Sequence, residues 1–199
     1  GMRNPQNIEE VVTLCPDYMG FIFYEKSPRN VILENNLVAI KNIPNNIKKV
    51  GVFVNESFDN IIDICDRYQL DIVQLHGNEN LELCQQLKAK KIGVFKVFSV
   101  DSAFDFQQTI PFENDVDYFL FDTKGDGYGG HGKTFDWNIL SKYNQKVPFL
   151  LAGGVSLENL AEVQKLQGLN LAGIDVNSKF EISPALKNIE LLKKLLESI

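Results

Sequence analysis

One carboxylate stands directly after a strand-like run and directly before a glycine-rich segment. Tyr118–Phe121 is uninterruptedly apolar, Asp122 follows it, and five glycines come within the next eleven residues. In an α/β protein the tip of a buried strand is where catalytic groups are placed, because the strand is rigid while the loop beyond it varies. Glycines adopt positive φ without steric cost, so this loop can fold closely over a ligand. The pattern predicts an acid beneath a substrate-covering loop, and an acidic strand end before a flexible connector is the alternative.

Two further strand-like runs end in residues that can bind a ligand. Gln74 and His76 share one face because side chains alternate along a strand. His76 could help to position a substrate, or its ring could simply bond to the backbone. Gly153 and Gly154 follow another apolar run, and glycines at a strand end let backbone N–H groups approach an anion. A Gly-Gly turn alone is weak support for an anion site.

The elements that must position these residues alternate along the chain. A first helix is expected where Asn4 can cap and Pro5 suits the first turn. Strands are expected near 18–23, 49–54, 71–75, 92–98, 117–122, 148–152 and 171–176. Further helices are expected near 33–42, 57–68, 79–90, 103–109, 136–142, 157–167 and 187–198. Apolar strands separated by helices predict a single α/β domain over residues 1–199, built on a parallel sheet.

Composition argues against several classes of protein. The net charge of −6, without a run of Lys or Arg, argues against a nucleic-acid partner. No apolar stretch approaches the roughly 20 residues of a membrane helix and no signal pattern begins the chain, so a cytoplasmic location is expected. Cys15, Cys65 and Cys84 are odd in number and lack CxxC spacing, which argues against a disulfide framework or a zinc site. No metal-ligand cluster is visible in the sequence.

The string from Asp122 to Trp137, DTKxxGxGGxGKTFDW, resembles the sixth βα loop of the phosphoribosylanthranilate isomerase family of tryptophan biosynthesis. The resemblance extends over most of the chain. It includes Gly-Phe-Ile-Phe-x-x-x-Ser-Pro-Arg ending at Arg29, Gln-Leu-His-Gly at 74–77 and the run 173–181. It implies a TIM (β/α)8-type parallel barrel whose reaction is an Amadori rearrangement of an N-linked phosphoribosyl aminoaldose to an aminoketose. No organic cofactor and no metal are expected.

The resemblance also implies that the first strand of the barrel is missing. Members of the family open with a short strand that ends in Lys-x-Cys-Gly, followed directly by a helix, and this chain starts at Gly1. A start codon placed too far downstream, or loss in evolution, would have this result. The strands near 18–23 and 171–176 would each lose a neighbour, so we expect a gap between two unpaired edges. Solvent, a partner chain or rearranged N-terminal residues would fill it, and eight complete strands would contradict the expectation.

The family's chemistry assigns Asp122 as the general acid that protonates the ring oxygen and opens the sugar to a Schiff base. This role requires a pKa raised by burial, and capping a loop glycine is the alternative. The family's general base, which removes the C2 proton, is the cysteine of the missing strand. Cys15 lies at the wrong end of its unit to replace it, and Cys65 and Cys84 are expected to be packing residues. The chain is therefore expected to be nearly inactive, since one positioned base contributes about 10²- to 10⁴-fold.

Substrate-binding residues are implied as well. Arg29 matches the residue that holds the anthranilate carboxylate, a group that a planar guanidinium binds through two N–H groups, and a surface arginine is the alternative. Barrels often bind phosphate after strands seven and eight. The residues at those positions are Gly153, Gly154, Asp175, Asn177 and Ser178. Asn177 and Lys179 depart from the serine and glycine of the family motif. Lysine tolerates positive φ poorly, so Lys179 would add a charge near the phosphate or point to solvent.

Two other functions stay open from the sequence. The chain could bind sugar phosphates without turnover, or it could be another phosphate-binding barrel enzyme, such as an epimerase or a tryptophan synthase α-like lyase, because barrels host many reactions. The expected partner is a small sugar phosphate that carries anthranilate, and monomer and homodimer are both open. His131, in the glycine-rich loop, is expected to be incidental, and Asp126, in the same loop, is expected to face solvent.

Overall fold

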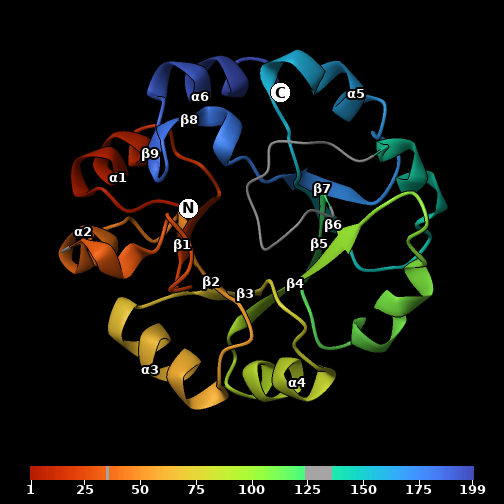
Figure 1. Cartoon of the computed structure of the whole chain (residues 1–199), viewed down its shortest axis with the longest axis horizontal. Coiled ribbons are helices and arrows are strands. Elements are labelled where there is room, and N and C mark those ends of the chain that lie inside the picture. The colour runs from red at the N-terminus through yellow and green to blue at the C-terminus, as the bar shows by residue number, and fades with distance from the viewer. Residues whose placement is uncertain (35, 124–135) are drawn as a thin grey trace.

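The protein is built on one parallel sheet that curls into an open barrel, as the computed structural model shows for residues 1–34, 36–123 and 136–199 (Figure 1). Each strand pairs in parallel with the next strand along the chain. The strands are β1 (Tyr18–Ile22), β2 (Lys48–Phe53), β3 (Ile72–Leu75), β4 (Gly93–Val100), β5 (Tyr118–Thr123), β6 (Phe149–Leu151) and β7 (Leu171–Ile174). The expected α/β barrel with seven visible strands is confirmed.

β1 and β7 are the two edges of this sheet, and no ladder joins them among the described residues. The first two residues lie at this opening, beside β1 (Figure 1). Met2 N donates to Gly20 O of β1 at 2.8 Å, and Gly1 N donates to Asn177 Oδ1, beyond β7, at 3.1 Å. The gap expected between the two edges is therefore present, and N-terminal residues occupy part of it.

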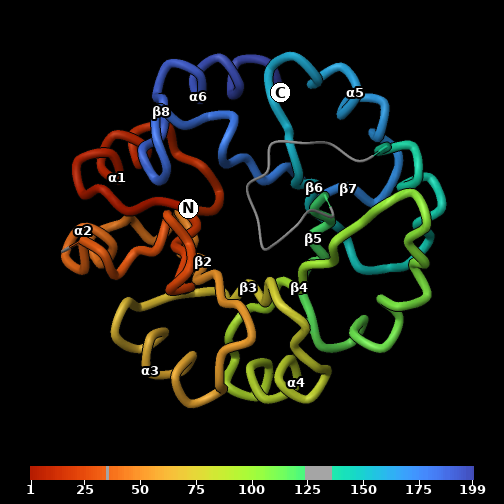
Figure 2. The backbone as a smooth tube through the Cα atoms, viewed as in Figure 1, coloured from red at the N-terminus to blue at the C-terminus, as the bar shows by residue number. Residues whose placement is uncertain are grey.

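Helices surround the sheet and cover its outer face (Figure 2). They are α1 (Pro5–Val12), α2 (Leu37–Lys41), α3 (Phe58–Tyr68), α4 (Leu81–Ala89), α5 (Leu160–Gln164) and α6 (Ile189–Leu196). In α1, α3, α4 and α6 the residue before the helix is Asn or Ser, and its side chain accepts a hydrogen bond from a first-turn N–H group. These caps satisfy N–H groups that have no partner inside the helix. None of the helices in the described part of the chain is long and apolar enough to span a membrane.

Four expected helices are wholly or partly 3-10 helices. The segments are Val31–Leu33, Phe106–Phe112, Trp137–Lys142 and Leu157–Asn159. Where the sequence predicts helices near 33–42 and 157–167, only the short α2 and α5 are α-helical. A short segment gains few backbone hydrogen bonds for the entropy it loses, so tertiary packing decides its form. In Phe106–Phe112, Pro111 also lacks the N–H group that an α-helix would use.

Apolar side chains pack on both faces of the sheet. Side chains that point outward from the strands meet the helices, and Phe21, Phe53, Phe119, Phe121 and Phe149 are fully buried there. The alternate positions point into the barrel and form a second cluster of Val50, Ile72, Phe95, Val97, Leu120, Leu150 and Ala152. Because both faces are buried, the strands are apolar throughout, as the sequence indicates. The barrel is thus a rigid support for residues at its strand ends.

A short antiparallel hairpin, β8 (Glu181–Ser183) and β9 (Leu186–Lys187), follows β7 and was not expected. Asn7 of α1 holds it in place. Lys187 N donates to Asn7 Oδ1 at 2.7 Å, and Asn7 Nδ2 donates to Lys187 O at 3.0 Å. The amide of Asn7 therefore makes the two hydrogen bonds that a neighbouring strand would make to the backbone of Lys187. The hairpin lies against α1 near the opening of the barrel (Figure 1).

Candidate active site

The acid expected at the tip of β5 lies against a histidine from the end of β3. Asp122 Oδ2 is 3.3 Å from His76 Nε2, and each side chain is 14% exposed. Asp122 Oδ1 accepts a hydrogen bond from Thr123 N at 2.8 Å. Parallel strands bring these two residues together because their carboxyl ends meet at one edge of the sheet. The carboxyl group is thus held at both oxygens and faces the barrel mouth.

Gln74 supports the ring of His76 from the same strand. Its Nε2 lies 3.3 Å from His76 Nδ1, and the side chain is buried. An amide nitrogen only donates hydrogen bonds, so this contact makes Nδ1 the acceptor. In a neutral ring the proton then lies on Nε2 and points at Asp122. The shared face predicted for Gln74 and His76 is thus the arrangement in the structure, and the two residues form a line that ends at the carboxylate.

Beside Asp122, two glycines after β6 turn the backbone sharply. Gly153 and Gly154 have φ of +79° and +76°, a region that side chains disfavour. A Cβ atom at position 153 would press on Thr123 Oγ1, and it would lie 2.5 Å from Thr123 N and 2.9 Å from Asp122 Oδ1. The N–H groups of both glycines have no hydrogen-bond partner among the described residues. These bare N–H groups are suited to an anionic oxygen.

The substitution Gly153→Ala is expected to destabilise the fold more than Gly168→Ala. Gly168 also has positive φ (+98°), but a Cβ atom there meets nothing within 4 Å. Both substitutions carry a conformational cost of about 1–2 kcal/mol, and only Gly153→Ala adds a clash worth roughly 1–3 kcal/mol. Urea unfolding measures both free energies. Equal losses of unfolding free energy in the two variants would mean that a Cβ atom at position 153 does not clash with Thr123.

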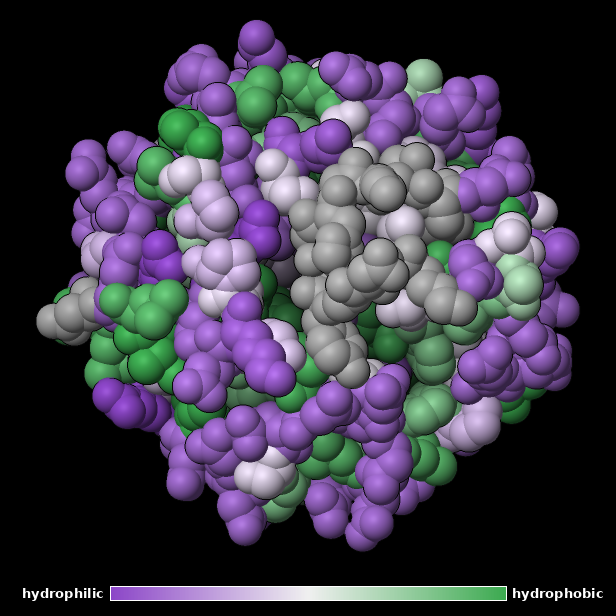
Figure 3. All heavy atoms as spheres, in the orientation of Figure 1, coloured by the Kyte–Doolittle hydropathy of each residue, from purple (hydrophilic) through white to green (hydrophobic). Residues whose placement is uncertain are grey.

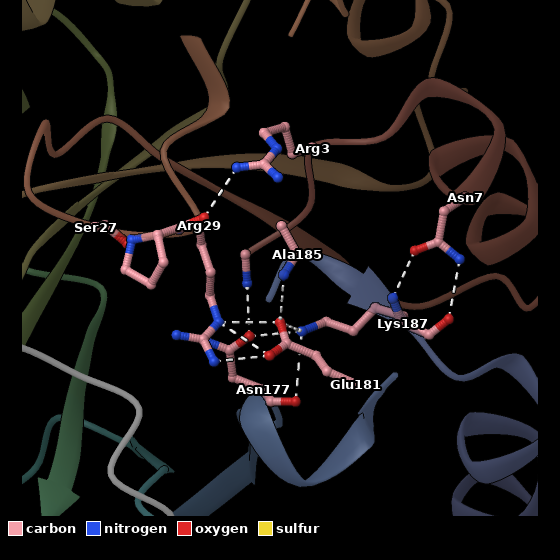
Figure 4. A network of polar contacts seen from close by, with 10 residues as sticks. Arg3, Asn7, Ser27, Arg29, Asn177, Glu181, Ala185 and Lys187 are labelled. Atoms are coloured by element: carbon pink, nitrogen blue, oxygen red, sulfur yellow. Dashed lines mark hydrogen bonds and ion pairs between the residues drawn. The ribbon is translucent and has the colours of Figure 1, made fainter. Parts of the chain in front are cut away.

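Arg29 lies beyond β1, and its guanidinium meets a carboxylate of the protein (Figure 4). Arg29 Nε is 3.0 Å from both carboxylate oxygens of Glu181, and Nη2 is 2.7 Å from Oε2. The side chains are 12% and 4% exposed. Nη1 has no hydrogen-bond partner among the described residues, so one edge of the guanidinium stays available. A carboxylate ligand would thus meet an arginine already fixed in orientation.

A second cation reaches the same carboxylate from β9. Lys187 Nζ donates to Glu181 Oε1 at 2.8 Å, and also to the backbone and side-chain oxygens of Asn177 (Figure 4). Burial raises the pKa of Glu181, but the hydrogen bonds and charges of Arg29 and Lys187 outweigh it and lower that pKa to about 2. Burial lowers the pKa of Lys187, and Glu181 offsets this only in part. Two cations thus share the Glu181 carboxylate, and the Asp175 carboxylate is a further negative charge near Lys187.

Glu181 should make the stability of the fold sensitive to acid. Its folded-state pKa of about 2 lies below the ordinary value of 4.5, so the stabilisation is complete above about pH 4.5 and is lost as pH falls towards 2. The difference in unfolding free energy between the parent and Glu181→Gln is expected to shrink by on the order of 3 kcal/mol across that window. Urea unfolding, followed by the fluorescence of Trp137, the single tryptophan, measures it.

The matched control for this pH effect is Glu34→Gln. Glu34 pairs with Arg3 at 2.9 Å nearby, but its side chain is 35% exposed and solvent screens the pair. Its effect on stability should stay within about 1 kcal/mol at every pH. A Glu181→Gln effect that did not vary between pH 6 and 2 would contradict the expectation.

The remaining candidates lie on the segment after β7. Asp175 N donates to Leu151 O at 2.8 Å, and Ser178 opens the 3-10 helix Ser178–Phe180. Lys179 is exposed and is not among the positive-φ residues, so it fits its position without the strain that the sequence suggested. The backbone N–H groups expected to bind phosphate thus lie near Lys187, a buried cation. Asp126 and His131 fall outside the described residues.

One cavity of about 880 Å³ connects these groups. Its polar lining includes Arg29, Gln74, His76, Asp122, Gly153, Gly154, Asp175, Asn177, Ser178 and Lys187. Its apolar lining runs down the barrel past Phe95 and Leu120 to the opening between β1 and β7. On the face seen in Figure 3, the surface is mostly hydrophilic, with small hydrophobic groups between the polar ones. A cavity with polar groups at the mouth and apolar walls suits a ligand with a charged part and an aromatic part.

A family model described as N-(5'-phosphoribosyl)anthranilate (PRA) isomerase matches residues 1–198. The chain belongs to the phosphoribosylanthranilate isomerase family. Proteins named N-(5'-phosphoribosyl)anthranilate isomerase include that of Parabacteroides distasonis, 45% identical over all of this chain and 90% of that protein. The protein of that name from Caldanaerobacter subterraneus is 38% identical over all of this chain and 95% of that protein.

Solved structures of phosphoribosylanthranilate isomerases share the fold. The enzyme from Thermotoga maritima has a TM-score of 0.84 at 32% identity, over 98% of this chain and 94% of that one. A structure of the isomerase with reduced 1-(o-carboxyphenylamino)-1-deoxyribulose 5-phosphate has a TM-score of 0.77 at 27% identity, over 98% and 93% of the two chains. The resemblance stated from the sequence motifs is thus confirmed as family membership.

The three cysteines of this family member do not line the cavity. Cys15 is exposed beyond α1, and Cys65 and Cys84 are buried in α3 and α4. Burial raises the pKa of the Cys65 thiol to about 12 and that of Cys84 to about 11, so both are protonated at neutral pH. They are packing residues, as expected. Among the described residues, no group of three or more His, Cys, Asp and Glu side chains could hold a metal ion.

Sequence reasoning missed the partners of Arg29 in this isomerase family member. Glu181 stands at the end of the last motif, but its spacing from Arg29 along the chain does not indicate a contact. Lys187 lies outside every motif. Both reach the mouth because the unexpected β8–β9 hairpin turns back towards β1. Glu181 at the end of the last motif, two residues after Lys179, gave no sign of a contact with Arg29.

Proposed function

We propose that this chain acts on N-(5'-phosphoribosyl)anthranilate and converts it to 1-(2-carboxyphenylamino)-1-deoxyribulose 5-phosphate, the isomerisation for which its family is named. This is an Amadori rearrangement within tryptophan biosynthesis. The observation that carries the proposal for these residues is the contact of Asp122 with His76 at the cavity mouth, beside the two left-handed glycines. One acid, one positioned ring and two bare N–H groups then surround one space.

Asp122 is proposed as the general acid. Its Oδ2 faces the cavity beside His76 Nε2, where a proton can pass to the ring oxygen of a bound ribose and open it to a Schiff base. Thr123 N holds the other oxygen and keeps the carboxyl group in one orientation. His76 and Gln74 act by positioning, since their line of contacts ends on the carboxyl group. The cavity walls exclude water from the Schiff base once the substrate is bound.

The two charged ends of the substrate have separate partners in this proposal. The free edge of Arg29 takes the anthranilate carboxylate, and Glu181 holds that arginine still. The phosphate is taken by the N–H groups of Gly153 and Gly154 and by the segment with Asp175, Asn177 and Ser178, with Lys187 supplying positive charge. The partner is therefore a small anionic molecule. We also propose a cytoplasmic location, which suits a small metabolite as substrate and the acidic composition.

No cysteine among the described residues lines the cavity, so none of them is placed to act as the general base. This observation favours one second candidate, a barrel that binds the sugar phosphate without turnover. The two candidates predict the same binding and different rates. Binding is therefore tested first and separately from catalysis.

Binding of reduced 1-(o-carboxyphenylamino)-1-deoxyribulose 5-phosphate to this chain tests the recognition step. Its affinity is expected to exceed that of the analogue without the carboxyl group by about tenfold or more, because a charge-assisted pair with Arg29 is worth roughly 1.5–3 kcal/mol. Isothermal titration calorimetry of both compounds measures this ratio. Equal affinities would show that Arg29 does not hold the carboxylate. No binding of either compound would count against the proposed substrate itself.

A further inference from the structure

A buried ion pair lies behind the active-site histidine, and the mechanism above does not use it. Lys96 Nζ of β4 and Glu79 Oε2, after β3, are 2.9 Å apart, and their side chains are 4% and 2% exposed. Lys96 lies between Phe95 and Val97, which point into the barrel, so its own side chain lies on the helix side of the sheet. Taking two charges out of water is unfavourable unless further hydrogen bonds accompany the pair. Its contacts therefore indicate what it does.

The lysine holds the backbone on both sides of His76. Lys96 Nζ donates to Gly77 O at 2.8 Å and to Leu75 O at 3.5 Å, in addition to Glu79. The three hydrogens of the ammonium group are thereby used. The two carbonyls belong to the residues immediately before and after the histidine. His76 N itself donates to Phe53 O at 2.9 Å, so the whole turn is held from behind.

The glutamate holds the N–H groups of the same turn. Glu79 Oε1 accepts from Gly77 N at 2.9 Å and from Asn55 N at 2.9 Å, and its Oε2 accepts from Gly77 N at 3.0 Å. A Cβ atom on Gly77 would press on Asn55 Oδ1 and lie 2.7 Å from Glu79 Oε1. The turn after β3 thus packs directly on the carboxylate. An apolar pair of the same volume would leave these backbone groups without hydrogen-bond partners.

We propose that the Glu79–Lys96 pair is a positioning device that fixes the turn 75–77, so that the His76 ring spans Gln74 and Asp122. The inference deepens the proposed function and rests on it for the role of Asp122. The pair touches neither the cavity lining nor the reacting atoms and acts only through the backbone of the turn. Loosening the pair should free the imidazole from Asp122 while the barrel stays folded.

The first readout is the exchange of the His76 Nε2–H proton with water, measured by NMR. The chain has two histidines, so a His131→Gln background leaves one ring to observe. In that background we expect Lys96→Met and Glu79→Gln each to raise the exchange rate by about tenfold or more, because the turn opens more often. Lys88→Met is the matched control. It breaks the ion pair between Lys88 Nζ and Asp117 Oδ1, which are 2.6 Å apart at the other end of the strands and whose side chains are more than 30% exposed. This substitution should leave the proton exchange rate of His76 unchanged.

The second readout is turnover in a chain completed by a strand that carries the family's cysteine. There the two substitutions should lower kcat by about 10- to 100-fold with little change in KM, as small misplacements of a positioned group do. Because the exchange measurement needs no substrate, it can succeed or fail independently of the isomerase proposal. Loss of turnover with unchanged proton exchange would count against the positioning role.

A third variant keeps the proposal testable where a charge substitution prevents folding. Gly77→Ala alters no charge but pushes the turn away from Glu79 and Asn55, and it should raise the exchange rate in the same way. An unchanged rate in Gly77→Ala and in every folded variant of the pair would make the pair purely structural and overturn the inference. An equal rise in Lys88→Met would overturn it too.

Discussion

An added N-terminal strand that places Lys-x-Cys before Gly1 is expected to raise the isomerase turnover of this chain by about 10²- to 10⁴-fold, the usual contribution of one positioned base. Two features of the structure support the size of this effect. The cavity opens between the unpaired edges of β1 and β7, where an eighth strand would close the barrel. None of the three cysteines lines that cavity. The loss of phosphoribosylanthranilate fluorescence measures turnover.

The matched control carries the same strand with Lys-x-Ser before Gly1. Both additions should pair with the two edges and raise the unfolding temperature to the same extent, since each closes the sheet. Only the cysteine supplies a group that can be a thiolate near neutral pH. Equal turnover of the two would show that the base is elsewhere. If both extended proteins fold and bind the reduced product analogue but neither turns over substrate, the result would favour a function in binding without catalysis.

The substitution Asp122→Asn in the cysteine-completed chain is expected to lower kcat by about 10²- to 10⁴-fold and to change KM only a few-fold. Asparagine keeps the shape of the side chain and can still accept the hydrogen bond from Thr123 N. Its amide is too weak an acid to protonate the ribose ring oxygen, so ring opening would lose the proposed general acid. Single-turnover kinetics, which separate binding from chemistry, give the two constants.

Asp117→Asn is the matched control for the acid, at the opposite end of the same β5 region. Asp117 accepts from Val94 N at 2.7 Å and pairs with Lys88, and it does not line the cavity. Its replacement should leave kcat within about twofold, because a half-exposed ion pair contributes little. If Asp122→Asn kept the parent rate, the proton would come from another group and the acid assignment would be wrong.

Local patterns predicted the elements that hold the site. Each strand of the parallel sheet, β1 to β7, is found within two residues of its expected bounds, because an apolar run with both faces buried is a short-range property of the chain. Asp122 at a strand tip, and Gln74 and His76 on one face, follow from the same rule. The short helices were less predictable. In Phe106–Phe112, for example, rings packed against Phe98, Phe121 and Tyr143 decide the local form.

The apolar strands and the helices between them determined a parallel sheet whose strand ends lie together, and the resemblance of the motifs to the isomerase family implied the barrel and the residues at its mouth. Only the tertiary structure decided which charges meet. Arg29 and Glu181 are 152 residues apart in the chain, and Lys96 and Glu79 are 17 apart on different elements. An ion pair depends on where folded segments cross and on how far water is excluded there. Residue spacing along the chain predicts neither property, so the ion pairs that orient Arg29 and His76 are seen only in the folded structure.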